Sequence, residues 1–320
     1  MARNAESPAA SAFETSVSGA ASARDAGQDR EPAERVAFES AEVAGVRLFY
    51  REAGDPSKPT IVLLHGFPSS SFQFHDLIPR LADRFHVIAP DLPGMGYSDA
   101  PAPTVLRPTF DDLARVIDAF IAQRGAGPVI LYLYDIGGSI GMRVATAHPE
   151  RIAGLVLQNM TISLNGWAPA TLKFYEQVGG PETPDKLAEA ERRATIERDI
   201  FLHRTGAHRP DVLNPDHWAI DTYAFSIESK RLFMSRLLMN MEANFPLYRE
   251  WTAYLKERQP KSLILWGRND PIFTPGAPDD LKQALPAAEL RYFDGGHFVL
   301  DEYADAIAEA IIETFSPPGK

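Results

Sequence analysis

Short apolar runs that alternate with stretches of helical spacing constrain the fold of this chain most strongly. Residues 60–64 read TIVLL, and a branched apolar run of this length is typical of a strand buried on both faces. Residues 110–123 carry apolar side chains three and four positions apart, which predicts an amphipathic helix. Alternating strands and helices predict an α/β fold with a mostly parallel, doubly wound sheet. We expect strands at 46–50, 60–64, 85–89, 129–134, 152–157, 262–266 and 290–293, and helices at 110–123, 141–147 and 303–315.

One region interrupts this rhythm. Residues 161–246 lack a strong buried-strand pattern and contain helical stretches at 185–198 and 229–241. We interpret 161–246 as a helical cap inserted into a core formed by 35–160 and 247–320. Such an insertion can cover the carboxyl edge of a parallel sheet, where these sheets bind ligands. Residues 1–34 are rich in Ala, Ser and Glu without a hydrophobic period, which predicts a disordered tail.

The composition limits the possible partners. The net charge of −11 disfavours nucleic acid and anionic membrane surfaces. The absence of cysteine excludes disulfides, thiolate metal sites and thiol nucleophiles. No apolar run is long enough to span a bilayer, and the acidic N-terminal segment has no signal-peptide core, so we expect a cytoplasmic protein. The sequence does not predict the oligomeric state.

Three polar residues follow predicted strands in an order that indicates a catalytic triad. Asp135, in LYLYDIGG, stands between a strand and a glycine-rich helix start, the place of a nucleophile elbow. Asp270 follows a strand in LILWGRNDP, and His297 follows the last strand in FDGGHF. Asp135 could instead cap a helix, and Asp294 or Asp301 could support the histidine in place of Asp270.

Two backbone N–H groups are candidates for an oxyanion hole. The segment LLHGFP ends a strand, and the loop after it can offer the N–H of Phe67. The N–H of Ile136, directly after the candidate nucleophile, would be the second donor. We expect His65 in the same segment to be structural.

The motifs HGFP, PDLPGMGYSD, YDIGG, WGRND and GGHF occur here in one order. In this the chain resembles the α/β-hydrolase superfamily, and within it the aspartate-nucleophile branch of epoxide hydrolases and haloalkane dehalogenases, over residues 36–315. The resemblance implies that Asp135 forms an alkyl ester with substrate and that His297, held by Asp270, activates the water that hydrolyses it. It implies no cofactor and no metal.

An epoxide also needs an acid for its ring oxygen, and epoxide hydrolases use two cap tyrosines. Tyr248 in NFPLYREW resembles one of them in context. Tyr175 in LKFYEQVGG is our second candidate, with Tyr223 as the alternative to it.

Haloalkane dehalogenases usually place a tryptophan directly after the nucleophile, where this chain has Ile136. Many carry Asn or Glu where Phe67 stands, and haloacetate dehalogenases carry arginines where Ile136 and Ser139 stand. Conversely, Leu133 is more typical of a dehalogenase than of an epoxide hydrolase. Trp167 and the pair at 217–218 could bind halide or form the core of the cap.

We therefore expect hydrolysis of an epoxide to a diol. The alternatives are carbon–halogen hydrolysis, ester or lactone cleavage by the same residues, and a non-catalytic small-ligand receptor on the same fold. Cap aromatic residues indicate a small apolar organic substrate, which reacts with water. These residues are Phe174, Trp218, Phe225 and Phe233.

Overall fold

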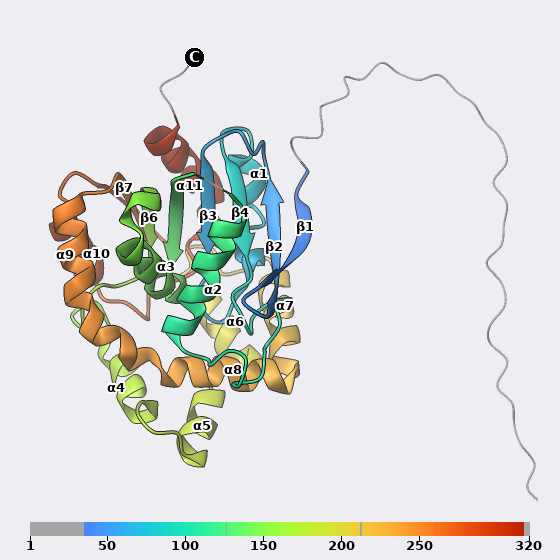
Figure 1. The fold of residues 1–320 in the computed structure, drawn as a ribbon. Helices are drawn as coiled ribbons and strands as arrows, with labels where there is room; N and C mark the ends of the chain where they lie inside the picture. Colours follow the sequence, from blue (N-terminus) through green and yellow to red (C-terminus); the bar gives the residue numbers. More distant parts are fainter. Residues whose placement is uncertain (1–34, 126, 212, 317–320) are drawn as a thin grey trace, which may run out of the picture. The chain divides into compact units, whose positions relative to one another are not determined.

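The computed structural model describes residues 35–125, 127–211 and 213–316, and an eight-stranded sheet lies at their centre (Figure 1). The strand order is β1-β2-β4-β3-β5-β6-β7-β8. The pairs β1–β2 and β2–β4 are antiparallel, and all other neighbours are parallel, which confirms the predicted sheet. The strands are β1 (Ala37–Val43), β2 (Val46–Ala53), β3 (Thr60–Leu64), β4 (His86–Pro90), β5 (Val129–Tyr134), β6 (Ile152–Gln158), β7 (Ser262–Gly267) and β8 (Glu289–Phe293).

The sequence pattern located the seven strands β2 to β8 but not β1. Every side chain of β3 and β5 is buried, as expected for central parallel strands. In contrast, most side chains of β1 are exposed. An exposed edge strand carries little hydrophobic signal, which is why the pattern missed it.

Helices of the core flank this sheet. In α2 the hydroxyl of Thr109 accepts a hydrogen bond from the N–H of Asp112 and so caps the first turn. The buried side of α2 carries the apolar stripe that predicted it. The helix predicted at 141–147 starts earlier, at Ile136, because the glycines after Asp135 are already helical. The core helices are α1 (Leu77–Leu81), α2 (Phe110–Gln123), α3 (Ile136–Ala147), α9 (Tyr248–Arg258), α10 (Gly276–Ala284) and α11 (Leu300–Phe315).

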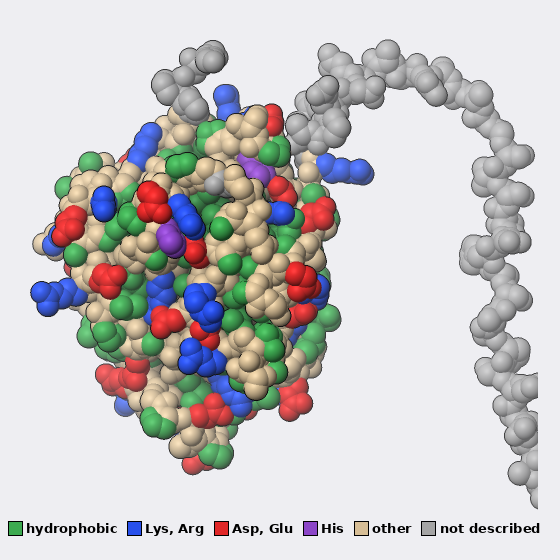
Figure 2. Space-filling view, in the orientation of Figure 1, with side chains coloured by type: hydrophobic (Ala, Val, Ile, Leu, Met, Phe, Trp, Pro, Cys, Tyr) green, Lys and Arg blue, Asp and Glu red, His purple; other side chains and the backbone are tan. Residues whose placement is uncertain are grey.

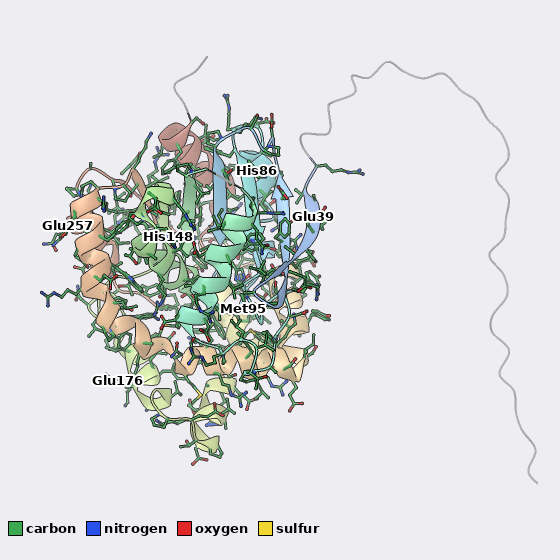
Figure 3. The ribbon with its side chains drawn as sticks, in the orientation of Figure 1. Glu39, His86, Met95, His148, Glu176 and Glu257 are labelled. Atoms are coloured by element: carbon green, nitrogen blue, oxygen red, sulfur yellow. The ribbon has the colours of Figure 1, made fainter. Side chains whose placement is uncertain are left out.

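Five further helices lie between β6 and α9, at one end of the sheet (Figure 1). Figure 3 shows His86, at the start of β4, at the opposite end, and Met95, beyond the carboxyl end of β4, on the side of these helices. The cap helices therefore face the carboxyl ends of the parallel strands. They are α4 (Pro169–Val178), α5 (Pro184–Glu191), α6 (Ile196–Arg204), α7 (Asp216–Ser226) and α8 (Glu228–Met239).

The prediction of one continuous helical stretch at 185–198 is wrong, because the chain forms two helices there. Helix α5 ends at Glu191, and α6 begins at Ile196. The hydroxyl of Thr195 accepts a hydrogen bond from the N–H of Arg198 and so starts a new helix. The break matters for the site, because it brings Arg193 and Arg198 to the same cavity.

Charged side chains of both signs are interspersed over the face that Figure 2 shows. None of the helices in the described part of the chain has the length and apolar character that crossing a bilayer requires. The tail predicted at 1–34 lies outside the described residues.

Candidate active site

Asp135 lies in the sharp turn between β5 and α3. Its φ of 48° and ψ of −120° form a conformation that residues other than glycine rarely adopt, at a cost of about 1–3 kcal/mol. Gly137 permits the turn, because a Cβ there would lie 2.5 Å from the carbonyl oxygen of Leu64 in β3. The side chain of Asp135 makes no capping hydrogen bond to α3. The geometry thus favours the elbow over the helix cap.

The two predicted N–H donors converge on the carboxylate of Asp135. The N–H of Phe67 donates to Oδ1 at 2.8 Å, and the N–H of Ile136 lies close enough to the carboxylate to help lower its pKa. Burial raises the pKa of Asp135 above its ordinary value, although His297 and the two N–H groups oppose this shift. His65 has a structural role, since its Nε2 accepts a hydrogen bond from the N–H of Leu92.

His297 joins the two acids. Its Nδ1 lies 2.9 Å from Oδ2 of Asp270, and its Nε2 lies 3.7 Å from Oδ2 of Asp135. Burial lowers the pKa of His297, but the charge and hydrogen bond of Asp270, helped by Asp135, raise it by more, so the net shift is upward. The alternative partners lie elsewhere, because Asp294 bonds His208 and Asp301 bonds His203.

Asn159, which sequence reasoning missed, fixes the carboxylate of Asp270 by a hydrogen bond. Its Nδ2 donates to Oδ2 of Asp270 at 2.7 Å, and its Oδ1 accepts from the N–H of Gly267 at 3.1 Å. The N–H groups of Ile272 and Phe273 bond the other carboxylate oxygen. Asp270 is therefore held as a hydrogen-bonded carboxylate. The available signal was the position of Asn159 two residues after the strand predicted at 152–157, at a strand end like that of Asp135.

A cavity of about 50 Å³ opens beside Asp135 under the cap. Its wall is largely apolar, but it brings together the carboxylate, His297 and the hydroxyl-bearing Tyr175 of α4. Burial, together with the charge of Asp135, raises the pKa of Tyr175, so this phenol stays protonated at neutral pH. The lining residues are Phe67, Asp135, Thr171, Phe174, Tyr175, Arg193, Arg198, Leu202, Leu238, Ile272 and His297.

Tyr248 lies behind this wall. It is buried, and its hydroxyl accepts a hydrogen bond from Nε1 of Trp167 at 2.9 Å. Within the described chain it does not line the cavity, although its hydroxyl is close enough to Tyr175 to influence the pKa of that residue. Tyr223 is 52% exposed and packs near Tyr97, away from Asp135.

The indole groups considered as halide ligands do not reach the cavity wall. The N–H of Trp167 is occupied by Tyr248, and its ring packs against Phe273. Among the residues that the structure covers, neither Trp167 nor Trp218 lines the cavity. Both pack instead within the cap and where it meets the core.

A buried ion pair joins the cap to the core next to the site. Nδ1 of His203 in α6 lies 2.7 Å from Oδ2 of Asp301 in α11, with both side chains almost completely buried. The ring of His203 also stacks on Phe298 at a centroid distance of 3.7 Å. Burial lowers the pKa of His203, but Asp301 more than offsets this and the net shift is upward. This pair therefore holds α6, the helix that carries Arg198, against α11 of the core.

Removing one partner of this pair should weaken folding. We expect Asp301→Ala to lower the free energy of unfolding by about 3–5 kcal/mol, because His203 and His217 both lose the buried carboxylate that they share. Chemical denaturation measures the change. Asp305→Ala on the same helix is the matched control, since Asp305 is 83% exposed and its pair with Arg80 should contribute less than about 1 kcal/mol. Equal stability of the two variants would refute a role of Asp301 in joining cap and core.

Further titratable side chains surround this pair. His203, His217 and Asp301 form one group, and Asp199, His203 and Asp221 a second, in which donor atoms lie within 4.8 Å of one another. That spacing would suit a metal ion. In the part of the chain that is described, none of these five residues lines the cavity. They are therefore not placed to act on a molecule bound beside Asp135.

Comparison with known proteins gives one family. The model of the α/β hydrolase fold family matches residues 59–304. An uncharacterized hydrolase of Saccharomyces cerevisiae is 32% identical over 278 residues, which cover 85% of this chain and 94% of that protein. Haloalkane dehalogenase 2 of Mycobacterium tuberculosis is 30% identical over 282 residues, with 84% of this chain and 91% of that protein covered.

Solved structures agree on the fold. Haloalkane dehalogenase DbeA of Bradyrhizobium elkani superimposes with a TM-score of 0.74 at 21% identity, covering 87% of this chain and 97% of its own. Epoxide hydrolase CorEH superimposes with a TM-score of 0.71 at 21% identity, covering 88% of this chain and 99% of its own. Both activities thus occur among proteins that share this fold.

Proposed function

Because the chain belongs to the α/β-hydrolase fold family, we propose that it hydrolyses an epoxide to a diol through a covalent ester on Asp135. One observation carries the proposal: the carboxylate of Asp135 and the side chain of Tyr175 line the same cavity. An epoxide needs both groups, a nucleophile for carbon and a proton donor for the ring oxygen.

The first step forms the ester. Asp135 is the acidic side chain in the cavity, and Oδ2 is the oxygen that Phe67 does not bond. Oδ2 attacks a ring carbon, the bond from that carbon to the ring oxygen breaks, and Tyr175 transfers its proton to this oxygen. The product is a hydroxyalkyl ester on the enzyme, with Tyr175 left as a phenolate.

The second step hydrolyses this ester. The 3.7 Å between Nε2 of His297 and Asp135 exceeds a hydrogen bond, which leaves Nε2 free to bind water. His297 takes one water proton, and the oxygen attacks the ester carbonyl. The N–H groups of Phe67 and Ile136 stabilise the oxyanion. The intermediate collapses to diol, which takes the proton of His297, and the acid proton of Asp135 returns to Tyr175.

Carbon–halogen hydrolysis is the second candidate, supported by the relative named haloalkane dehalogenase 2. It would use the same ester and the same water. A departing halide needs N–H donors near the nucleophile, and the apolar side chains of Phe67 and Ile136 supply none directly beside Asp135; the side-chain N–H groups that reach the cavity belong to Arg193 and Arg198 of the cap. This difference favours the epoxide. A non-catalytic receptor would bind ligand in the same cavity without releasing product, and a turnover assay separates it from both enzymes.

Tyr175→Phe is the experiment that tests the substrate class. We expect diol formation from an epoxide to fall by about 10²-fold or more, because the ring oxygen loses its acid. Halide release from a haloalkane needs no such proton and should change little. The measurement is kcat for a panel of both substrate types, with diol and halide quantified separately.

Two tyrosine variants serve as references. Tyr223→Phe should leave the rate unchanged, since that side chain is exposed. Tyr248→Phe tests the first predicted tyrosine, whose hydroxyl bonds Trp167 and which does not line the cavity within the described residues, so it should slow the epoxide reaction less than Tyr175→Phe does. An epoxide rate within about twofold of wild type in Tyr175→Phe would remove Tyr175 from the chemistry. Halide release with no diol would replace the epoxide by the haloalkane.

A further inference from the structure

Two arginines of the cap share the cavity with Asp135. Arg193 lies in the break between α5 and α6, and Arg198 lies in the first turn of α6. Together they place two positive charges on a wall that is otherwise largely apolar. A neutral, apolar substrate, as expected from the sequence, would make no use of these two positive charges in binding.

Within the described residues, neither guanidinium forms an ion pair. Their neighbours are paired, since Arg192 bonds Glu189 and Arg231 bonds Glu191. By contrast, no carboxylate among the described residues lies within 4 Å of the guanidinium of Arg193 or Arg198. Burial lowers the pKa of Arg198, so this charge loses solvation without gaining a counter-ion. The described part of the protein thus provides no carboxylate for these two guanidinium groups, and a bound anion could supply the missing negative charge.

Aromatic faces hold both groups in place. The guanidinium carbon of Arg193 lies 4.1 Å from the ring centroid of Phe174, itself a lining residue, and that of Arg198 lies 4.7 Å from the ring of Phe201. A guanidinium held through its face keeps the N–H edge available for a ligand. The positive charges also reach the reacting groups, because both lower the pKa of Tyr175 and Arg198 lowers that of His297.

We propose that Arg193 and Arg198 form a subsite for a carboxylate on the substrate. The substrate is then a small epoxide that carries a carboxylate, in place of the apolar molecule expected from the sequence. Arginine suits this task, because its planar fork can donate two parallel hydrogen bonds to a carboxylate. The inference that the substrate is an epoxide rests on the proposed function. The inference that it carries a carboxylate rests on the two arginines alone.

A binding experiment tests the subsite without any chemistry. Crotonate resembles 2,3-epoxybutanoate but has no ring to open, and crotonamide is its neutral match. By titration calorimetry we expect the wild-type protein to bind crotonate at least about tenfold more tightly than crotonamide. Arg193→Gln and Arg198→Gln should each weaken crotonate binding by about tenfold and leave crotonamide unaffected.

Controls separate this role from a structural one. Arg192→Gln removes the adjacent, exposed arginine and should bind crotonate as the wild type does. Arg198→Lys keeps the charge and should retain more affinity than Arg198→Gln. Equal binding of the two probes, or unchanged crotonate affinity in folded Arg193→Gln and Arg198→Gln, would overturn the subsite.

Turnover measured in parallel distinguishes the two proposals. The wild type should show a higher kcat/KM for 2,3-epoxybutanoate than for 2,3-epoxybutane, in which a methyl group replaces the carboxylate. Equal or reversed preference would overturn the subsite as a determinant of specificity. Selective crotonate binding without turnover of either epoxide would support the subsite and refute the epoxide reaction.

Discussion

Asp135→Asn is expected to abolish turnover, with a loss in kcat of at least about 10⁴-fold. The amide cannot act as the nucleophile, and no other acidic side chain lines the cavity within the described residues. Folding should not suffer. Because burial raises the pKa of Asp135, the ionised carboxylate destabilises the folded protein at neutral pH, and a neutral amide removes that cost. Steady-state kinetics and thermal unfolding together measure both effects.

Two further variants secure this result. Asp135→Ala cannot be hydrolysed back to the acid, so it excludes recovery of activity by deamidation. Asp294→Asn removes an exposed carboxylate three residues before His297 and should leave kcat unchanged. A wild-type rate in Asp135→Asn and Asp135→Ala would remove Asp135 from the reaction and with it the ester mechanism.

His297→Gln is expected to stop the reaction halfway. Ester formation needs Asp135 as the nucleophile and Tyr175 as the acid, and in this step neither group transfers a proton to or from His297. Ester hydrolysis needs a base for water, and His297 is the basic group held by Asp270. We therefore expect each active site to consume one substrate molecule and then to stall, with steady-state kcat lowered by about 10³-fold or more. Rapid quench kinetics should show a burst of substrate consumption without product.

The sequence was most informative where a residue's role depends on its position at a strand end. Asp135, Asp270 and His297 each follow a parallel strand, and in a parallel sheet those ends meet at one edge. Their convergence was therefore predictable without knowledge of side-chain packing. The same reasoning could have identified Asn159, which directly follows the end of β6 and bonds Asp270.

The cap was less predictable, because its contacts join segments far apart in the sequence. Tyr248 and Tyr175 were both candidates from local context, yet only Tyr175 lines the cavity within the described residues. The difference arises from Trp167, 81 positions from Tyr248, which bonds that hydroxyl. The sequence did not indicate that Arg193 and Arg198 share a cavity, because a continuous helix was predicted there and gave no reason to expect the two side chains at one place. The break before Thr195 changes their directions.

Intact mass spectrometry of His297→Gln after exposure to epoxides and haloalkanes tests the ester mechanism most directly. We expect a stoichiometric adduct on Asp135 equal to the mass of a whole epoxide, because ring opening loses no atoms. An adduct equal to a haloalkane minus hydrogen halide would retain the aspartate nucleophile but assign carbon–halogen hydrolysis. Folded His297→Gln that forms no adduct with either class of substrate would contradict the covalent mechanism.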